Sequence, residues 1–171
     1  MSTATPPGLK VRVLSVTPAA ERIVEIRLES AEGEPLPSWT PGSHIDVFLD
    51  ADLVRQYSLC SSPDDPTWRL GVLEELAGRG GSHHVHHRLR VGDVLEVSRP
   101  RNNFPLELAE RPIIFVSGGI GITPLLPMVR AAHAAGAAWR MLHLVRDEAS
   151  SAFDADLVPY GDRVVRHVDA I

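Results

Sequence analysis

The chain has 171 residues and a net charge of −5, which allows one large domain or two small ones. This mild acidity argues against nucleic acid as a partner, and no apolar run approaches the roughly 20 residues that a membrane-spanning helix needs. One cysteine, Cys60, excludes an internal disulfide and a four-cysteine zinc or iron–sulfur site within this chain. Because the N-terminus lacks the pattern of a secretory signal, the cytoplasm is the expected location.

The first part of the chain predicts β structure. Short segments with alternating apolar and polar residues, typical of half-buried strands, are separated by turns rich in proline and glycine. The six expected strands span residues 9–17, 22–30, 44–49, 55–60, 68–73 and 94–98, with a short turn at PAAE between the first two and a helix over 82–89. Because closure removes exposed strand edges, we expect residues 8–108 to form a six-stranded antiparallel barrel.

From residue 109 the pattern is that of an α/β fold. A continuous apolar run at 112–117 is typical of a strand buried on both faces, and a glycine-rich turn follows it. The further expected elements are a helix over 124–135, a strand over 139–145, a helix over 151–158 and a strand over 163–168. This alternation predicts a parallel sheet. Three such strands are half of a nucleotide-binding fold, so we expect residues 109–171 to form the N-terminal half of an NAD(P)-binding domain.

The segment RQYSL, at residues 55–59, offers the groups that a flavin needs. Arg55 suits a phosphate in bidentate geometry, Tyr57 suits the face of a flat ring, and Ser58 is a short hydrogen-bonding group. An ordinary strand with an exposed arginine and a half-buried tyrosine is an equally open interpretation of this pentapeptide alone.

The segment GRGGS, at residues 78–82, lies just before the expected helix. Its glycines let the backbone approach a ligand, and free amides at a helix start attract a phosphate. Arg79 adds charge, and Ser82 suits either the helix cap or the phosphate. A glycine-rich surface turn is the alternative, but together with Arg55 the segment indicates a two-arginine phosphate site.

The segment SGGIGITPL, at residues 117–125, follows a strand and opens a helix, as a dinucleotide-binding loop does. Its glycines permit close backbone approach. Thr123 is the expected N-cap, with Pro124 at the first helical position. A nucleotide contact is favoured here over a plain strand-to-helix turn.

These three motifs and PRNNFPL, at residues 100–106, resemble in order and spacing the phthalate dioxygenase reductase and vanillate demethylase reductase family, which is similar to ferredoxin–NADP reductases. The resemblance covers essentially the whole chain. It implies a barrel that binds FMN and a nicotinamide domain, with electrons passing from NAD(P)H through FMN to an iron–sulfur or Rieske-type oxygenase or demethylase component. Family members end in a plant-type [2Fe–2S] domain, which we expect this chain to lack together with the later strands of the nicotinamide domain.

The same resemblance implies a set of site residues. Arg55 and Ser58 would contact FMN, Tyr57 would lie beside its ring, and Tyr57 and Ser58 are the catalytic candidates. Leu73 and its neighbours would run alongside the isoalloxazine ring and contact it through their backbone. The other implied residues are Arg79, Gly80, Gly81 and Ser82 at the phosphate, and Gly118, Gly119 and Thr123 on the nicotinamide side.

Two further features are not among the predicted site residues. Histidines 83, 84, 86 and 87 form a cluster in which His83 and His87 share a helix face at a spacing that can bind a metal, but no acidic residue between them completes a metalloprotease motif. We therefore expect no native metal site there, only adventitious nickel or zinc binding. Cys60 is expected to be a packing residue, although a position near the flavin stays open.

Three functions compete. The leading one is an NAD(P)H-dependent flavin oxidoreductase, because flavin converts two-electron into one-electron chemistry. The second is a truncated flavin-binding module with little turnover, and the third is a metal-binding barrel. An open edge on the first parallel strand would also permit dimerisation. The sequence does not specify the electron acceptor or its aromatic substrate, and residues 143–147 are where a preference for NADH or NADPH is expected to lie.

Overall fold

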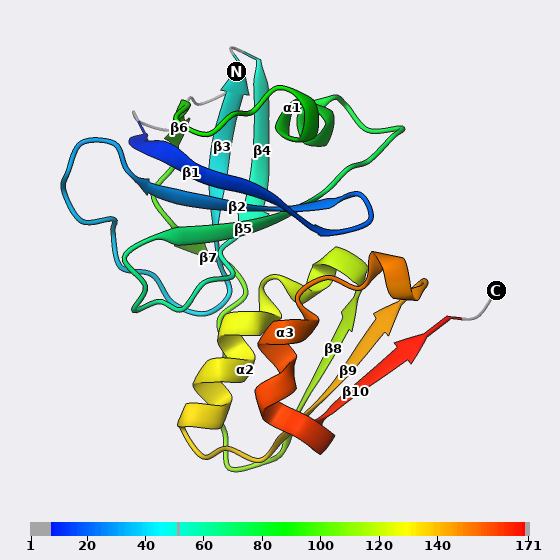
Figure 1. Cartoon of the computed structure of the whole chain (residues 1–171). Coiled ribbons are helices and arrows are strands. Elements are labelled where there is room, and N and C mark those ends of the chain that lie inside the picture. Colours follow the sequence, from blue (N-terminus) through cyan, green and yellow to red (C-terminus); the bar gives the residue numbers. More distant parts are fainter. Residues whose placement is uncertain (1–7, 51, 170–171) are drawn as a thin grey trace.

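The computed structural model describes residues 8–50 and 52–169, in which a β-barrel lies against a smaller α/β unit (Figure 1). The barrel strands are β1 (Leu9–Ala20), β2 (Ile23–Ser30), β3 (Ser43–Asp50), β4 (Leu53–Ser58), β5 (Trp68–Leu73), β6 (Val94–Val97) and β7 (Arg101–Asn102). Six of them pair in the order β4-β3-β6-β1-β2-β5, all antiparallel, and the short β7 adds to β3. The two ends of this path meet where the amide of Cys60 donates to the carbonyl of Arg69 at 2.9 Å. The predicted six-stranded antiparallel barrel is confirmed.

The barrel interior is filled by the apolar residues that alternate along its strands. Leu28 of β2, Ile45 of β3 and Trp68 of β5 are all buried. Helix α1 (Gly81–His87) covers one end of the barrel and contributes Val85 to the same core (Figure 1). Burial of side chains of this size stabilises the fold by about 1.5–3 kcal/mol each, so the loops that leave these strands start from fixed positions.

The β1–β2 hairpin differs from the prediction at its tip. The predicted turn PAAE is wrong, because β1 continues to Ala20 and the turn consists of Glu21 and Arg22. Pro18 is accommodated within the strand by a register shift between Pro18 and Ala20, which interrupts the ladder there. The tip contacts the α/β unit, where the amide of Glu21 donates to the carbonyl of Ala149 at 2.7 Å.

The α/β unit is built on a parallel sheet of three strands, β8 (Ile113–Gly118), β9 (Trp139–Val145) and β10 (Val164–Val168), in the order β10-β9-β8. Its helical segments are η1 (Gly119–Ile122), α2 (Leu125–Ala134), η2 (Glu148–Ser150), α3 (Asp154–Leu157) and η3 (Val158–Arg163). The predicted parallel sheet is confirmed, and β8 has a strand partner on only one side within the described residues. Among all the described residues, no helix is long and apolar enough to span a membrane.

The two faces of the parallel sheet differ. Helices α2 and α3 lie on one face (Figure 1), where Phe115 and Met141 are buried. On the opposite face Ile114 is 74% exposed, Val116 58% and Val165 53%. Within the described residues only one face of the sheet is covered. The prediction that the apolar run at 112–117 is buried on both faces is therefore wrong for this part of the structure.

A buried ion-pair network joins the barrel to the α/β unit. Arg69 of β5 donates through both terminal nitrogens to Asp156 of α3, at 2.8 and 2.6 Å, and its Nε donates to Glu25 of β2 at 2.7 Å. Arg130 of α2 donates to the same Asp156. Because Arg69 is only 7% exposed, solvent screens these contacts little, and they fix the orientation of the two units.

Candidate functional site

A cleft of about 390 Å³ lies where the barrel meets the α/β unit. It brings together three segments that are far apart in the sequence: the end of β4, the loop between β5 and α1, and the turn after β8. Its lining residues are Arg55, Gln56, Tyr57, Ser58, Gly71, Leu73, Glu75, Arg79, Gly81, Ser82, Ile120, Gly121, Thr123 and Pro124. Eight of the eleven predicted site residues are among them.

Arg55 is held in place by the loop that it faces. Its Nη2 donates to the carbonyl of Arg79 at 2.6 Å, and its Nη1 donates to the carbonyl of Val54 at 2.7 Å. A Cβ on Gly81 would lie 2.4 Å from the Arg55 side chain, so only glycine permits this approach. The two arginines that the sequence singled out therefore come together in the lining of the cleft, and Gly81 at the start of α1 lies against the Arg55 side chain.

Tyr57 and Ser58 line the same cleft from β4. Tyr57 packs partly against the barrel core, and this burial raises the pKa of its phenol to about 12. The phenol is therefore neutral at physiological pH. It can donate a hydrogen bond and present an apolar ring, but it does not supply a negative charge.

Ser82 does not cap α1. The helix begins after Gly80, which has a φ of 80° and makes no side-chain cap. The hydroxyl of Ser82 instead accepts a hydrogen bond from the amide of Glu75 at 3.0 Å. This contact closes the loop between β5 and α1 into a compact turn, and Glu75 lines the cleft.

Thr123 lies in the cleft, but the prediction that it is the N-cap of the following helix is wrong. Helix α2 begins at Leu125, and the turn η1 runs into it without an extended residue between them. The Thr123 hydroxyl therefore donates to the carbonyl of Ile120 at 3.0 Å. Its methyl group would lie 2.8 Å from a Cβ on Gly71, so that glycine, which the sequence reasoning missed, lets the two units come together.

Gly80, Gly118 and Gly119 do not line this cleft. Gly119 lines a second cleft of about 300 Å³, which shares Leu73 and Ile120 with the first. The other residues of the second cleft are Glu21, Arg22, Ile23, Arg146, Asp147 and Ser150. The hairpin tip and the turn after β9 were not predicted to meet here, because only the folded chain brings them together.

Cys60 is a buried packing residue. Its thiol donates to the carbonyl of Arg69 at 3.2 Å, and burial raises its pKa to about 12. A thiol that stays protonated at physiological pH is a poor nucleophile and metal ligand. Cys60 is absent from the lining of both clefts.

An antiparallel flavin-type barrel joined to a parallel sheet, with a glycine-lined cleft at the junction, defines the ferredoxin–NADP reductase class of fold. Over 95% of its length the chain matches phthalate dioxygenase reductase, a modular structure for electron transfer from pyridine nucleotides to [2Fe–2S], with a TM-score of 0.89 and 34% identity. It covers 52% of that chain. No protein-family model matches the sequence.

Curated relatives point the same way. The chain is 38% identical over 165 residues to vanillate O-demethylase oxidoreductase of Pseudomonas sp. (strain HR199), which is 94% of this chain and 52% of the relative. It is 36% identical over 164 residues to the carnitine monooxygenase reductase subunit of Escherichia coli K12, which is 92% of this chain and 51% of the relative. The chain thus spans about half the length of these relatives. Over that span it is similar to reductase components of oxygenase systems, as the resemblance of its motifs indicated.

Proposed function

We propose that the chain binds FMN in the cleft between β4 and the start of α1 and carries electrons from NAD(P)H through it to an iron–sulfur or Rieske-type oxygenase component. The observation that carries this proposal is the convergence of Arg55, Arg79 and Thr123 on one cleft from three separate segments. Flavin, when bound, accepts electrons in pairs and releases them singly, which is the conversion that such a chain of carriers needs.

The residues of the cleft fit a flavin phosphate. Arg55 and Arg79 supply positive charge, and Gly81 leaves room for the Arg55 side chain beside the helix start. Charge-assisted hydrogen bonds from arginine suit a phosphate monoester. A terminal phosphate held this way favours FMN over FAD, whose phosphates continue into an adenosine.

Each residue near the ring has a separate role in the proposal. Tyr57 would pack against the isoalloxazine, since its neutral phenol carries no charge to oppose electron uptake. Ser58 would hydrogen-bond the polar edge of the ring. Leu73 would lie between the flavin and the nicotinamide, because it lines both clefts.

The second cleft is the proposed entry for NAD(P)H. Arg146 and Asp147 line it beside Gly119, and they follow β9, where the sequence placed the nucleotide preference. The Asp147 carboxylate is engaged by the amide of Ser150 at 2.8 Å, which orients the turn. Because Ile120 and Leu73 border both clefts, a nicotinamide here would lie next to the flavin.

Identification of the bound flavin tests the cofactor. The protein is purified, denatured, and the released flavin is separated by chromatography. We expect FMN at close to one equivalent per chain. A predominance of FAD would refute the assignment of the phosphate site while leaving the flavin barrel intact.

A second candidate function is a flavin-binding module with little turnover. Within the described residues β8 has a strand partner on one side only and lies in a sheet with one uncovered face. This favours the module, because the groups that hold a nicotinamide against the flavin need a rigid support. Anaerobic stopped-flow reduction by NADH separates the two candidates. Fast, saturable bleaching of the flavin supports the reductase, whereas slow reduction linear in NADH supports the module. Sedimentation in the same buffer tests whether this edge makes the chain dimerise.

A further inference from the structure

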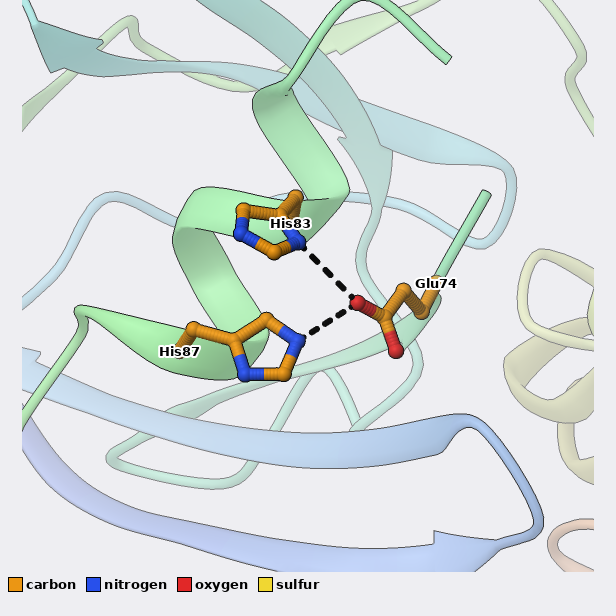
Figure 2. Close-up of side chains that lie close together, drawn as sticks. All are labelled: Glu74, His83 and His87. Carbon is orange, nitrogen blue, oxygen red and sulfur yellow. Dashed lines mark hydrogen bonds and ion pairs between the residues drawn. The ribbon is translucent and has the colours of Figure 1, made fainter. Parts of the chain in front are cut away.

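Helix α1 directs two histidines at a carboxylate that comes from a different element. Nε2 of His87 lies 2.6 Å from Oε1 of Glu74, and Nδ1 of His83 lies 3.3 Å from the same oxygen (Figure 2). Glu74 follows the last residue of β5, nine residues before His83 in the chain. The fold thus brings to the two histidines a carboxylate that the spacing within the helix does not predict.

The three side chains also lie close enough together to share one small cation. One ligand atom from each of Glu74, His83 and His87 lies within 4.8 Å of the other two. An ion about 2.1 Å from each atom in tetrahedral geometry would set them about 3.4 Å apart, which a small rotation of the side chains achieves. The histidine side chains are 62% and 52% exposed, so an ion can enter and keep a water ligand.

Hydrogen bonds to neighbouring elements hold the backbone of Glu74 and helix α1 in place. The amide of Glu74 donates to the carbonyl of Arg22 at 2.8 Å, and the Arg22 guanidinium donates to the carbonyl of Glu74. His86, on another side of the same helix, is occupied by the carbonyl of Val72, 2.9 Å from its Nε2. This anchor fixes the rotation of α1, and His83 and His87 consequently point toward Glu74.

We propose that Glu74, His83 and His87 form a binding site for a divalent transition metal ion of the Zn²⁺ type. Two imidazole nitrogens and one carboxylate oxygen are ligands that such ions prefer over Mg²⁺ or Ca²⁺. On binding, the hydrogens that His87 Nε2 and His83 Nδ1 share with Glu74 leave or move to the other nitrogen of each ring, so that both atoms present their lone pairs. The ion would fasten α1 to the end of β5, beside the turn that Glu75 and Ser82 close. The site does not depend on flavin.

Zinc titration of the whole chain tests the site. The protein is made without a histidine tag, stripped with chelator and titrated with ZnCl₂ by calorimetry at pH 7.5. We expect one ion per chain with a dissociation constant below about 10 µM, and affinity losses of at least about tenfold for His83→Ala and Glu74→Gln. His84→Ala is the matched control on the same helix and should bind as the parent does.

Two further measurements keep the proposal falsifiable if a variant is poorly folded. Far-ultraviolet circular dichroism in chelator shows whether each variant retains the parent fold, and Glu74→Gln preserves the shape of the side chain. Replacing Zn²⁺ by Co²⁺ should give the strong visible bands of a four-coordinate ion in the parent and lose them in His87→Ala. The proposal is overturned if Zn²⁺ binds more weakly than about 100 µM, or if His84→Ala loses as much affinity as His83→Ala.

Discussion

The barrel and the α/β unit bury their apolar residues to different extents. In the barrel, apolar residues of β1 to β6 share one core, and α1 closes its end. In the α/β unit, helices cover only one face of the sheet, and the other face exposes Ile114, Val116 and Val165 within the described residues. The barrel is thus complete in its own packing, whereas the parallel sheet depends on the barrel and on its own helices for all the cover it has.

The difference explains where the candidate site lies. A flavin needs rigid walls, and the barrel provides them through β4, β5 and the α1 start. The α/β unit adds only a turn, at Ile120 and Thr123, and that turn is positioned by the buried ion pairs at the junction. The following predictions test how far each region depends on the other.

Asp156→Ala should have the largest effect on stability. It leaves the buried Arg69 with Glu25 alone and removes the anchor of α3, which we expect to cost about 3 kcal/mol and about 6–12 °C in Tm. Calorimetry should show one transition in the parent and two in the variant, the barrel melting later. Asp162→Ala, on the exposed surface, is the control. A single transition with unchanged Tm would mean that the junction is held by other contacts.

Arg55→Ala should weaken FMN far more than riboflavin. The lost charge-assisted contact to phosphate is worth about 1.5–3 kcal/mol, or one to two decades in affinity. Arg55→Lys should recover part of the loss, because lysine keeps the charge without the fork. Flavin fluorescence titrations measure both ligands, with Arg12→Ala on the barrel surface as the control variant. Equal losses for FMN and riboflavin would assign Arg55 to the fold of the loop instead.

The pH dependence of stability should come partly from the α/β unit. Burial lowers the pKa of His143 below its usual 6.5, and its Nδ1 lies 2.8 Å from the Ser117 hydroxyl. The unfolded chain then binds a proton more readily than the folded one. The free energy of unfolding is therefore unaffected by the titration of His143 above pH 6.5, and it declines as the pH falls below that value.

Urea unfolding between pH 7.5 and 5 measures this decline, which for one group cannot exceed about 1.4 kcal/mol per pH unit. His143→Asn keeps a polar group near Ser117 but cannot titrate, so its stability should vary less over the same range. If the stability of His143→Asn varies with pH as much as that of the parent, another residue causes the pH dependence.

The barrel could be predicted because the alternation of apolar and polar residues along each strand shows which side chains face the core. The three motifs indicated the cleft because their glycines permit close backbone approach and their arginines suit a phosphate. Prediction failed where the structure depends on how successive elements join or on which distant elements pack together. Thr123 looked like an N-cap, but the preceding turn runs straight into α2. The apolar strand at 112–117 looked doubly buried, because apolar composition does not say whether a covering element is present. Glu74 reaches the histidines only through the pairing of β5 and the packing of α1, which no local pattern encodes.

The smallest effect should come from Ile114→Ser, on the uncovered face of β8. Ile114 is 74% exposed, so its replacement removes little buried area and should change the free energy of unfolding by no more than about 0.5 kcal/mol. Its neighbour Phe115 is 5% exposed on the covered face, and Phe115→Ser should be many times more costly. If the uncovered face makes chains associate, Ile114→Ser should also lower the sedimentation coefficient at high concentration, because a polar side chain interrupts the apolar patch. A large loss of stability in Ile114→Ser would show that this face is covered in solution. The two regions would then differ only in what covers them. The barrel would be packed by its own residues, and the α/β unit would be packed as fully but partly by another chain.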